Sequence, residues 1–95
     1  MIIKRDGSRP ETALVTFTLP STIWASSANL VADFNRWQPI PMRHNGSDEL
    51  QATVELRRGH TYHFRYLLNE DQWCTDGLAD GHAKRFGAHN SVLQL

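Results

Sequence analysis

The chain has 95 residues, of which 40% are hydrophobic, and its ten basic and ten acidic residues cancel. This length suits one domain with one core, and the hydrophobic share is ordinary for a folded, soluble chain rather than a disordered one. Proteins that bind phosphate backbones or anionic membranes usually carry a basic excess or stripe, which is absent from this sequence. We therefore expect neither nucleic acid nor membrane as a partner, but a neutral ligand or another protein.

The N-terminal residues and the cysteine content indicate a cytoplasmic protein. No apolar run approaches the roughly 18–20 residues that span a bilayer. The opening MIIKRDGSRP has no long apolar stretch beside its basic residues, so we expect no signal peptide. Cys74 is the only cysteine, which excludes a disulfide within the chain and fits a reducing compartment.

A charged lead-in precedes segments that have the two-residue period of β-strands. We expect residues 1–12 to be a loose lead-in and residues 13–95 to form the domain. Segments 14–19 (LVTFTL) and 50–56 (LQATVEL) each place every second side chain on one apolar face, as half-buried strands do.

Segment 61–69 is the clearest strand, and a hairpin turn at 69–71 leads from it into a short strand at 72–75. One face of the first strand carries an unbroken apolar series, Tyr62, Phe64, Tyr66 and Leu68. A last strand is predicted at 91–95, with Val92 directed inward and Leu93 and Leu95 as further core candidates. Short strands separated by turn signals, with no helical period in any window, predict an all-β sandwich.

Three side chains are predicted to share a surface outside this core. If Tyr62, Phe64 and Tyr66 point inward, Arg65 must point outward, because neighbouring residues of a strand face opposite sides. Trp73 lies across the hairpin turn from that strand, within reach of a diagonal contact. Trp37 follows an apolar, strand-like stretch and sits in the turn-forming loop DFNRWQP.

Two indoles beside a guanidinium are typical of sugar recognition. The apolar C–H patches of a pyranose ring stack on the flat, electron-rich indole face, and rigid tryptophan loses little side-chain entropy on binding. The hydroxyl groups around the ring need donors and acceptors; arginine supplies donors, and an asparagine amide supplies both. A neutral polyol also fits a chain with no net charge.

Each of these residues also has a purely structural interpretation. A tryptophan in a small β domain is more often part of the core, so Trp37 could be a plug on the core or an exposed stacking surface. Trp24 has no identifiable polar companions, and we assign it to the core or to a self-association patch. Arg65 alone would be a solvated charge, so only the combination with Trp37 and Trp73 indicates a ligand.

The chain resembles the glycogen- and starch-binding modules of carbohydrate-binding family 48. The resemblance is carried by five motifs in the same order, VTFTLP, LVADFNRW, YHFRYLLN, QW and FGAHNSVL, and covers residues 13–95. The family includes the N-terminal "early set" domains of isoamylases and branching enzymes of the glycoside hydrolase 13 group, and the glycogen-binding domain of the AMP-activated protein kinase beta subunit. The closest likeness is to a free-standing bacterial form.

This resemblance implies an immunoglobulin-like β-sandwich of the early-set type and a non-catalytic site for α-1,4-linked glucan. By its motifs, Trp37 and Trp73 are the stacking tryptophans, and Arg65 stands where the kinase subunit has a lysine. The family's Leu-Gly-Thr-x-Asn segment, which touches the sugar, implies that Phe86 and Asn90 are further carbohydrate-binding residues.

This sequence departs from the family pattern at two places. Ala88 replaces the threonine of that segment, so one hydrogen bond to the glucan is expected to be missing. The Asp-Pro that follows the second tryptophan in the family is Asp76-Gly77 here, so the loop at 76–86 is expected to differ and the contribution of Phe86 with it.

Catalysis is the first competing function, and we expect none. Glycoside hydrolysis needs two carboxylates about 5 Å or about 6.5–9.5 Å apart across a bound sugar. The available carboxylates lie at strand ends and in turns, where local hydrogen bonding explains them: Asp33, Glu70, Asp71 and Asp76. A thiol dyad of Cys74 with His63 or His89 is less favoured than an inert, buried cysteine beside the hairpin.

No metal or other cofactor is expected either. His60 and His63 lie three residues apart, and such residues of a strand point to opposite faces, so they cannot share one ion.

A protein-interaction module is the main alternative. Exposed aromatic side chains together with arginine are typical of interaction hot spots, so the same surface could dock a partner protein. The sequence pattern leaves α-glucan and protein open as ligands.

Overall fold

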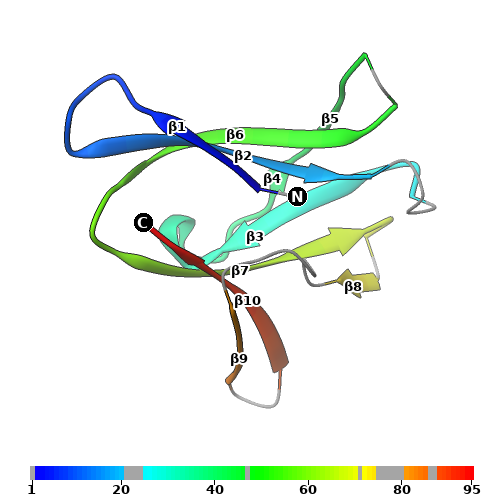
Figure 1. Cartoon of the computed structure of the whole chain (residues 1–95). Coiled ribbons are helices and arrows are strands. Elements are labelled where there is room, and N and C mark those ends of the chain that lie inside the picture. Colours follow the sequence, from blue (N-terminus) through cyan, green and yellow to red (C-terminus); the bar gives the residue numbers. More distant parts are fainter. Residues whose placement is uncertain (1, 21–24, 47, 71, 75–80, 86–87) are drawn as a thin grey trace.

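The computed structural model describes the chain apart from residues 1, 21–24, 47, 71, 75–80 and 86–87, and it describes residues 81–85 and 88–89 by their backbone only. Two antiparallel sheets pack face to face (Figure 1). This confirms the predicted all-β sandwich, and the immunoglobulin-like subtype stays a prediction.

The smaller sheet has four strands in the order β1-β2-β6-β5. Their bounds are Ile2–Asp6 for β1, Thr12–Leu19 for β2, Leu50–Arg57 for β6 and Arg43–His44 for β5. The long β2–β6 pair forms its centre, in register over the full length of both strands.

The larger sheet has six strands in the order β4-β3-β7-β10-β9, and β8 also pairs with β7. The bounds are Ile40–Pro41 (β4), Ala28–Ala32 (β3), Thr61–Leu68 (β7), Ala88–Gln94 (β10), Gly81–Arg85 (β9) and Gln72–Cys74 (β8). Strand β3 lies along one edge of β7, whereas β10 and β8 share the other edge. Outward side chains of β7 therefore lie in the middle of the sheet's outer face, the face turned away from the smaller sheet.

Aromatic side chains fill the space between the sheets. Phe17 of β2 meets Phe64 of β7 edge to face at 4.9 Å between ring centroids, and Phe64 meets Tyr66 in the same way at 5.7 Å. All three are fully buried. The inward series predicted for segment 61–69 is confirmed, because Tyr62, the least buried member, still packs against this core.

The prediction of a loose lead-in is wrong for residues 2–6. These residues form β1, the edge strand of the smaller sheet, paired with β2. Ile2 packs against the core, while Lys4 reaches across the sandwich to donate a hydrogen bond from Nζ to the Gln94 carbonyl at 3.1 Å. An edge strand can carry charged side chains on its inward face, because those side chains reach solvent at the edge of the sandwich. The charged residues therefore obscured the apolar–polar alternation by which the sequence would have identified β1 as a strand.

Two further expectations need correction. The segment 76–86, expected as a loop, contains β9, which pairs with β10. Val92 was expected to point inward, but it pairs with His63, whose face lies opposite to that of Phe64 and Tyr66. Leu93 takes the inward place and is fully buried. Strand β10 has buried side chains on both of its faces. In such a strand an apolar residue can lie on either face, so the apolar pattern does not show which face points into the core.

Candidate functional site

The outer face of the six-stranded sheet brings the predicted site residues together. Paired residues of neighbouring strands lie on the same side of a sheet. Arg65 pairs with Val31 of β3, and Trp73 of β8 pairs with Leu67 of β7. Arg65, Leu67 and Trp73 therefore share the outer face, as the alternation predicted.

Trp37 is placed by the short loop that follows β3. This loop forms a single 3₁₀ turn at Asp33–Asn35, and the amide of Trp37 then donates to the Ala32 carbonyl at 2.8 Å. Arg36 and Trp37 both have left-handed backbones, with φ of 52° and 61°. Non-glycine residues with this conformation cost roughly 1–2 kcal/mol each and tend to occur at functional sites.

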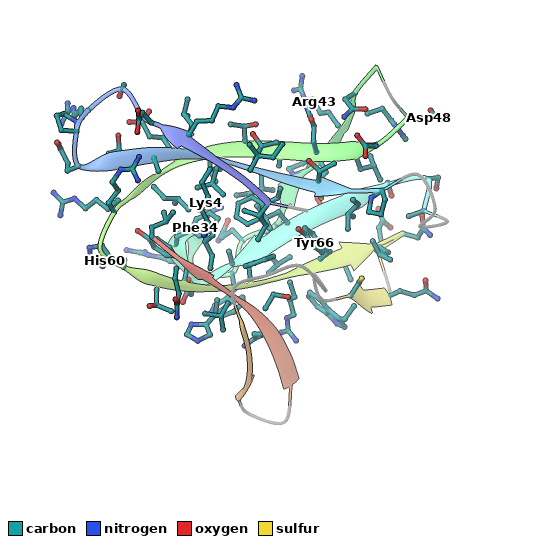
Figure 2. All side chains as sticks on the ribbon, in the orientation of Figure 1. Lys4, Phe34, Arg43, Asp48, His60 and Tyr66 are labelled. Atoms are coloured by element: carbon teal, nitrogen blue, oxygen red, sulfur yellow. The ribbon has the colours of Figure 1, made fainter. Side chains whose placement is uncertain are left out.

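Phe34, rather than Trp37, is the plug on the core. The Phe34 ring stacks on Phe17 at 6.3 Å and meets Tyr62 edge to face at 5.8 Å, and Figure 2 shows it between the two sheets. Trp37 remains 38% exposed. The question left open by the sequence is thereby answered: the loop is anchored by one aromatic residue and presents the other.

The β7–β8 hairpin presents the second tryptophan. Its turn contains Asn69 and Glu70, both left-handed, which is the conformation of a tight hairpin turn. The Asn69 Oδ1 accepts hydrogen bonds from the Ser26 amide at 2.9 Å and the Ser26 hydroxyl at 3.0 Å. Trp73 is 54% exposed, whereas Cys74, which follows it and was predicted to be buried, packs against the core but is only partly buried.

Arg65 lies between the two indoles. Its Cζ is 4.1 Å from the ring centroid of Trp73 and 5.7 Å from that of Trp37, both within the range of cation–π contact. We call these three side chains the indole platform. The predicted meeting of Trp37, Arg65 and Trp73 on one surface is thus present in the structure, and half-exposed Trp73 is its most accessible member.

Asn90 lies beside this group but is covered. Ser91 pairs with Phe64, so the antiparallel register brings Asn90 alongside Arg65 on the outer face. The Asn90 side chain is only 4% exposed. Its Oδ1 and the Arg65 Nε are both buried, and neither has a hydrogen-bond partner within the described structure. Direct contact of Asn90 with a ligand stays a prediction.

The structure adds an Asp33–His63 pair at the edge of the platform. His63 Nδ1 lies 3.2 Å from Asp33 Oδ2, and the two side chains are 22% and 31% exposed. Asp33 Oδ1 is buried and unpaired among the described residues. His63 lies two residues before Arg65 on the same face of β7, so the alternation alone could have placed it beside the site.

Other predicted residues lie outside the described structure. Trp24, Phe86 and the Asp76-Gly77 loop are among them, and Ala88 is described by its backbone only. The described residues contain no group of three or more histidine, cysteine, aspartate or glutamate side chains placed to hold a metal ion. The described part of the chain also contains no helix that is long and apolar enough to cross a membrane.

Neither a protein-family model nor a curated protein matches this chain.

Proposed function

We propose that the protein is a non-catalytic module that binds α-glucan, a glycogen- or starch-type chain of α-1,4-linked glucose, on the indole platform. The observation that carries this proposal is the exposure of two indoles within cation–π distance of one guanidinium, on the outer face of a sheet. An immunoglobulin-like sandwich of carbohydrate-binding family 48 and a cytoplasmic location are part of the same proposal, on the strength of the sequence motifs.

The geometry suits a sugar chain better than a compact ligand. The two ring centroids can be no farther apart than the sum of their distances to Arg65 Cζ, about 9.8 Å. Two flat surfaces this close can stack on two nearby rings of one oligosaccharide, with C–H patches against each indole. The platform is an open surface rather than a pocket, so it buries little of the ligand and a single module binds weakly.

Docking of a partner protein is the second candidate. Tryptophan and arginine are the residues most enriched in interaction hot spots, and both occur here on an accessible surface. A protein partner, however, would need a larger surface around the platform, since specific interfaces bury about 800 Å² on each partner. A sugar chain needs only the platform itself.

The test is migration in native gels cast with glycogen, amylopectin, dextran or no polysaccharide. We expect glycogen and amylopectin to retard the wild-type protein, and Trp37→Ala to abolish the retardation while the far-UV circular dichroism stays unchanged. Leu14→Ala is the matched control, because Leu14 is also an exposed apolar side chain but lies on the other sheet.

Three outcomes would contradict the proposal. Wild-type protein that is not retarded at high glycogen concentration does not bind α-glucan. Equal retardation by dextran, which is an α-1,6-linked glucan, would show that the linkage is not recognised. Equal loss of retardation in Leu14→Ala would show that the indole platform is not the site.

A further inference from the structure

The two indoles of the platform are carried by elements with little support of their own. Trp37 follows a single 3₁₀ turn in a loop with two left-handed residues. Trp73 belongs to β8, a three-residue strand that pairs with β7. Arg65, by contrast, lies within the central strand β7, which is paired along both edges. Arg65 is therefore the best-anchored member of the platform.

Stacking accounts for the position of the Arg65 guanidinium. A distance of 4.1 Å to the Trp73 ring centroid is that of direct contact between the guanidinium and the ring, and Trp37 lies within cation–π distance on the other side. The Arg65 Nε is buried without a described hydrogen-bond partner, although the equally unpaired Asn90 Oδ1 belongs to the neighbouring strand. The guanidinium therefore has the two rings as its neighbours, and its Nε has no hydrogen-bond partner among the described residues.

We infer that Arg65 is a positioning residue, which holds Trp37 and Trp73 together as one preorganised surface, rather than a hydrogen-bond donor to the sugar. This inference rests on the proposed function for its effect on binding. A guanidinium in contact with Trp73 and within cation–π distance of Trp37 ties the two weakly supported elements to β7 before the ligand arrives. Ordering the indoles in advance lowers the entropic cost of binding, which improves affinity without any new contact to the ligand.

The experiment compares wild type, Arg65→Gln and Arg65→Lys with two readouts. Glutamine keeps hydrogen-bond donors and removes the cation, whereas lysine keeps a cation that can still lie over the rings. The first readout, without ligand, is the near-UV circular dichroism and the ¹H–¹⁵N indole signals, assigned by Trp→Phe variants. The second is the affinity for maltoheptaose. Arg5→Gln is the matched control, because exposed Arg5 pairs with Leu14 on the other sheet.

We expect Arg65→Gln to shift the indole signals of Trp37 and Trp73 in the free protein and to weaken maltoheptaose binding about tenfold, the effect of one partly desolvated cation–π contact. Arg65→Lys should retain most of both properties, and Arg5→Gln all of them. If Arg65→Gln fails to fold, Arg65→Lys is compared with the wild type instead. Indole signals of the free Arg65→Lys protein that match those of the wild type then support the positioning role of Arg65.

The two readouts separate the inference from the proposed function. Unchanged indole signals in the free Arg65→Gln protein, with affinity lost, would overturn the positioning role and leave sugar binding intact. Shifted indole signals in a protein whose wild type does not bind maltoheptaose would overturn the proposed function and support the positioning role.

Discussion

The outer faces of the two sheets follow the same inward–outward alternation but carry different side chains. On the smaller sheet, Thr16 and Thr53 pair through their hydroxyls at 2.9 Å, and Glu55 accepts hydrogen bonds from the hydroxyls of Ser8 at 2.6 Å and Thr12 at 2.7 Å. The larger sheet carries, at its outer face, both tryptophans that the structure describes, Trp37 and Trp73, and both are exposed. All buried side-chain atoms without a partner in the described structure lie at this second face: Asp33 Oδ1, Arg65 Nε and Asn90 Oδ1.

The outer face of the smaller sheet therefore has the features of a stable surface, whereas the outer face of the larger sheet has those of a binding surface. Buried polar groups are nearly always hydrogen-bonded, and each one left unpaired costs about 1–3 kcal/mol. The smaller sheet obeys that rule at its outer face. The larger sheet departs from it around Arg65. Four of the five described non-glycine residues with positive φ also lie in its loops, Arg36, Trp37, Asn69 and Glu70, whereas the smaller sheet has one, Asp48. Unpaired groups, strain and exposed indoles coincide, as they do at binding sites.

The largest difference between the faces should appear in Trp73→Ala. We expect at least a tenfold loss of affinity for maltoheptaose, since one stacking surface disappears. The free energy of unfolding should change by less than about 1 kcal/mol, because the ring is already half exposed. Binding by isothermal titration calorimetry and urea denaturation measure the two effects. A loss of stability as large as that of a core variant would mean that Trp73 serves the fold.

Substitution of one polar residue on each face should change stability in opposite directions. Asn90→Val removes a buried, unpaired oxygen and should raise the free energy of unfolding by about 1 kcal/mol. Thr16→Val breaks the hydroxyl pair with Thr53 and should lower it by about 1 kcal/mol. Urea denaturation of each variant measures both changes in the free energy of unfolding. Destabilisation by Asn90→Val would show that the outer face of the larger sheet is as well satisfied as the other.

Strain in the hairpin that carries Trp73 should be measurable as well. Glycine adopts the left-handed conformation of Glu70 without steric cost, so Glu70→Gly should raise the free energy of unfolding by up to about 1 kcal/mol. The control is Glu11→Gly, an exposed position outside the residues with positive φ, where glycine should not stabilise. A destabilising Glu70→Gly would contradict the assignment of strain to this turn.

The smallest effect concerns acid stability and belongs to the smaller sheet. Hydrogen bonds from the side chains of Ser8 and Thr12 hold the pKa of Glu55 below its usual value of 4.5. A carboxylate with a lowered pKa in the folded state stabilises the fold above its unfolded pKa and loses this contribution as the pH falls through the folded pKa. Glu55→Gln should therefore reduce the loss of stability below pH 4.5, measured as Tm against pH. An unchanged slope would mean that these hydrogen bonds do not favour the charged form.

Much of the sandwich could be predicted because its long strands have one buried face. The alternation in β7 placed Phe64 inward and Arg65 outward, and the hairpin turn then brought Trp73 near Arg65. Strand β1 was missed because its inward lysine reaches the rim of an edge strand. Val92 was misplaced because β10 buries side chains on both faces, so that apolar content carries no directional signal.

The sequence predicted which residues form the candidate site but not how their side chains contact one another. The polar, turn-forming residues around Trp37 could not reveal that Phe34 fills the core and leaves the tryptophan exposed, because that depends on packing between distant strands. The approach of Arg65 to both rings depends likewise on the path of the loop and the hairpin. The Asp33–His63 pair joins residues 30 positions apart and has no local signature.

The most direct test of glucan binding on the indole platform is a titration of the uniformly ¹⁵N-labelled protein with maltoheptaose, observed at the indole signals assigned by Trp→Phe variants. We expect the signals of Trp37 and Trp73 to shift together and to saturate with a single binding constant, while backbone signals of the four-stranded sheet stay in place. Indole signals that do not move at millimolar maltoheptaose, or shifts confined to the four-stranded sheet, would contradict glucan binding on this platform.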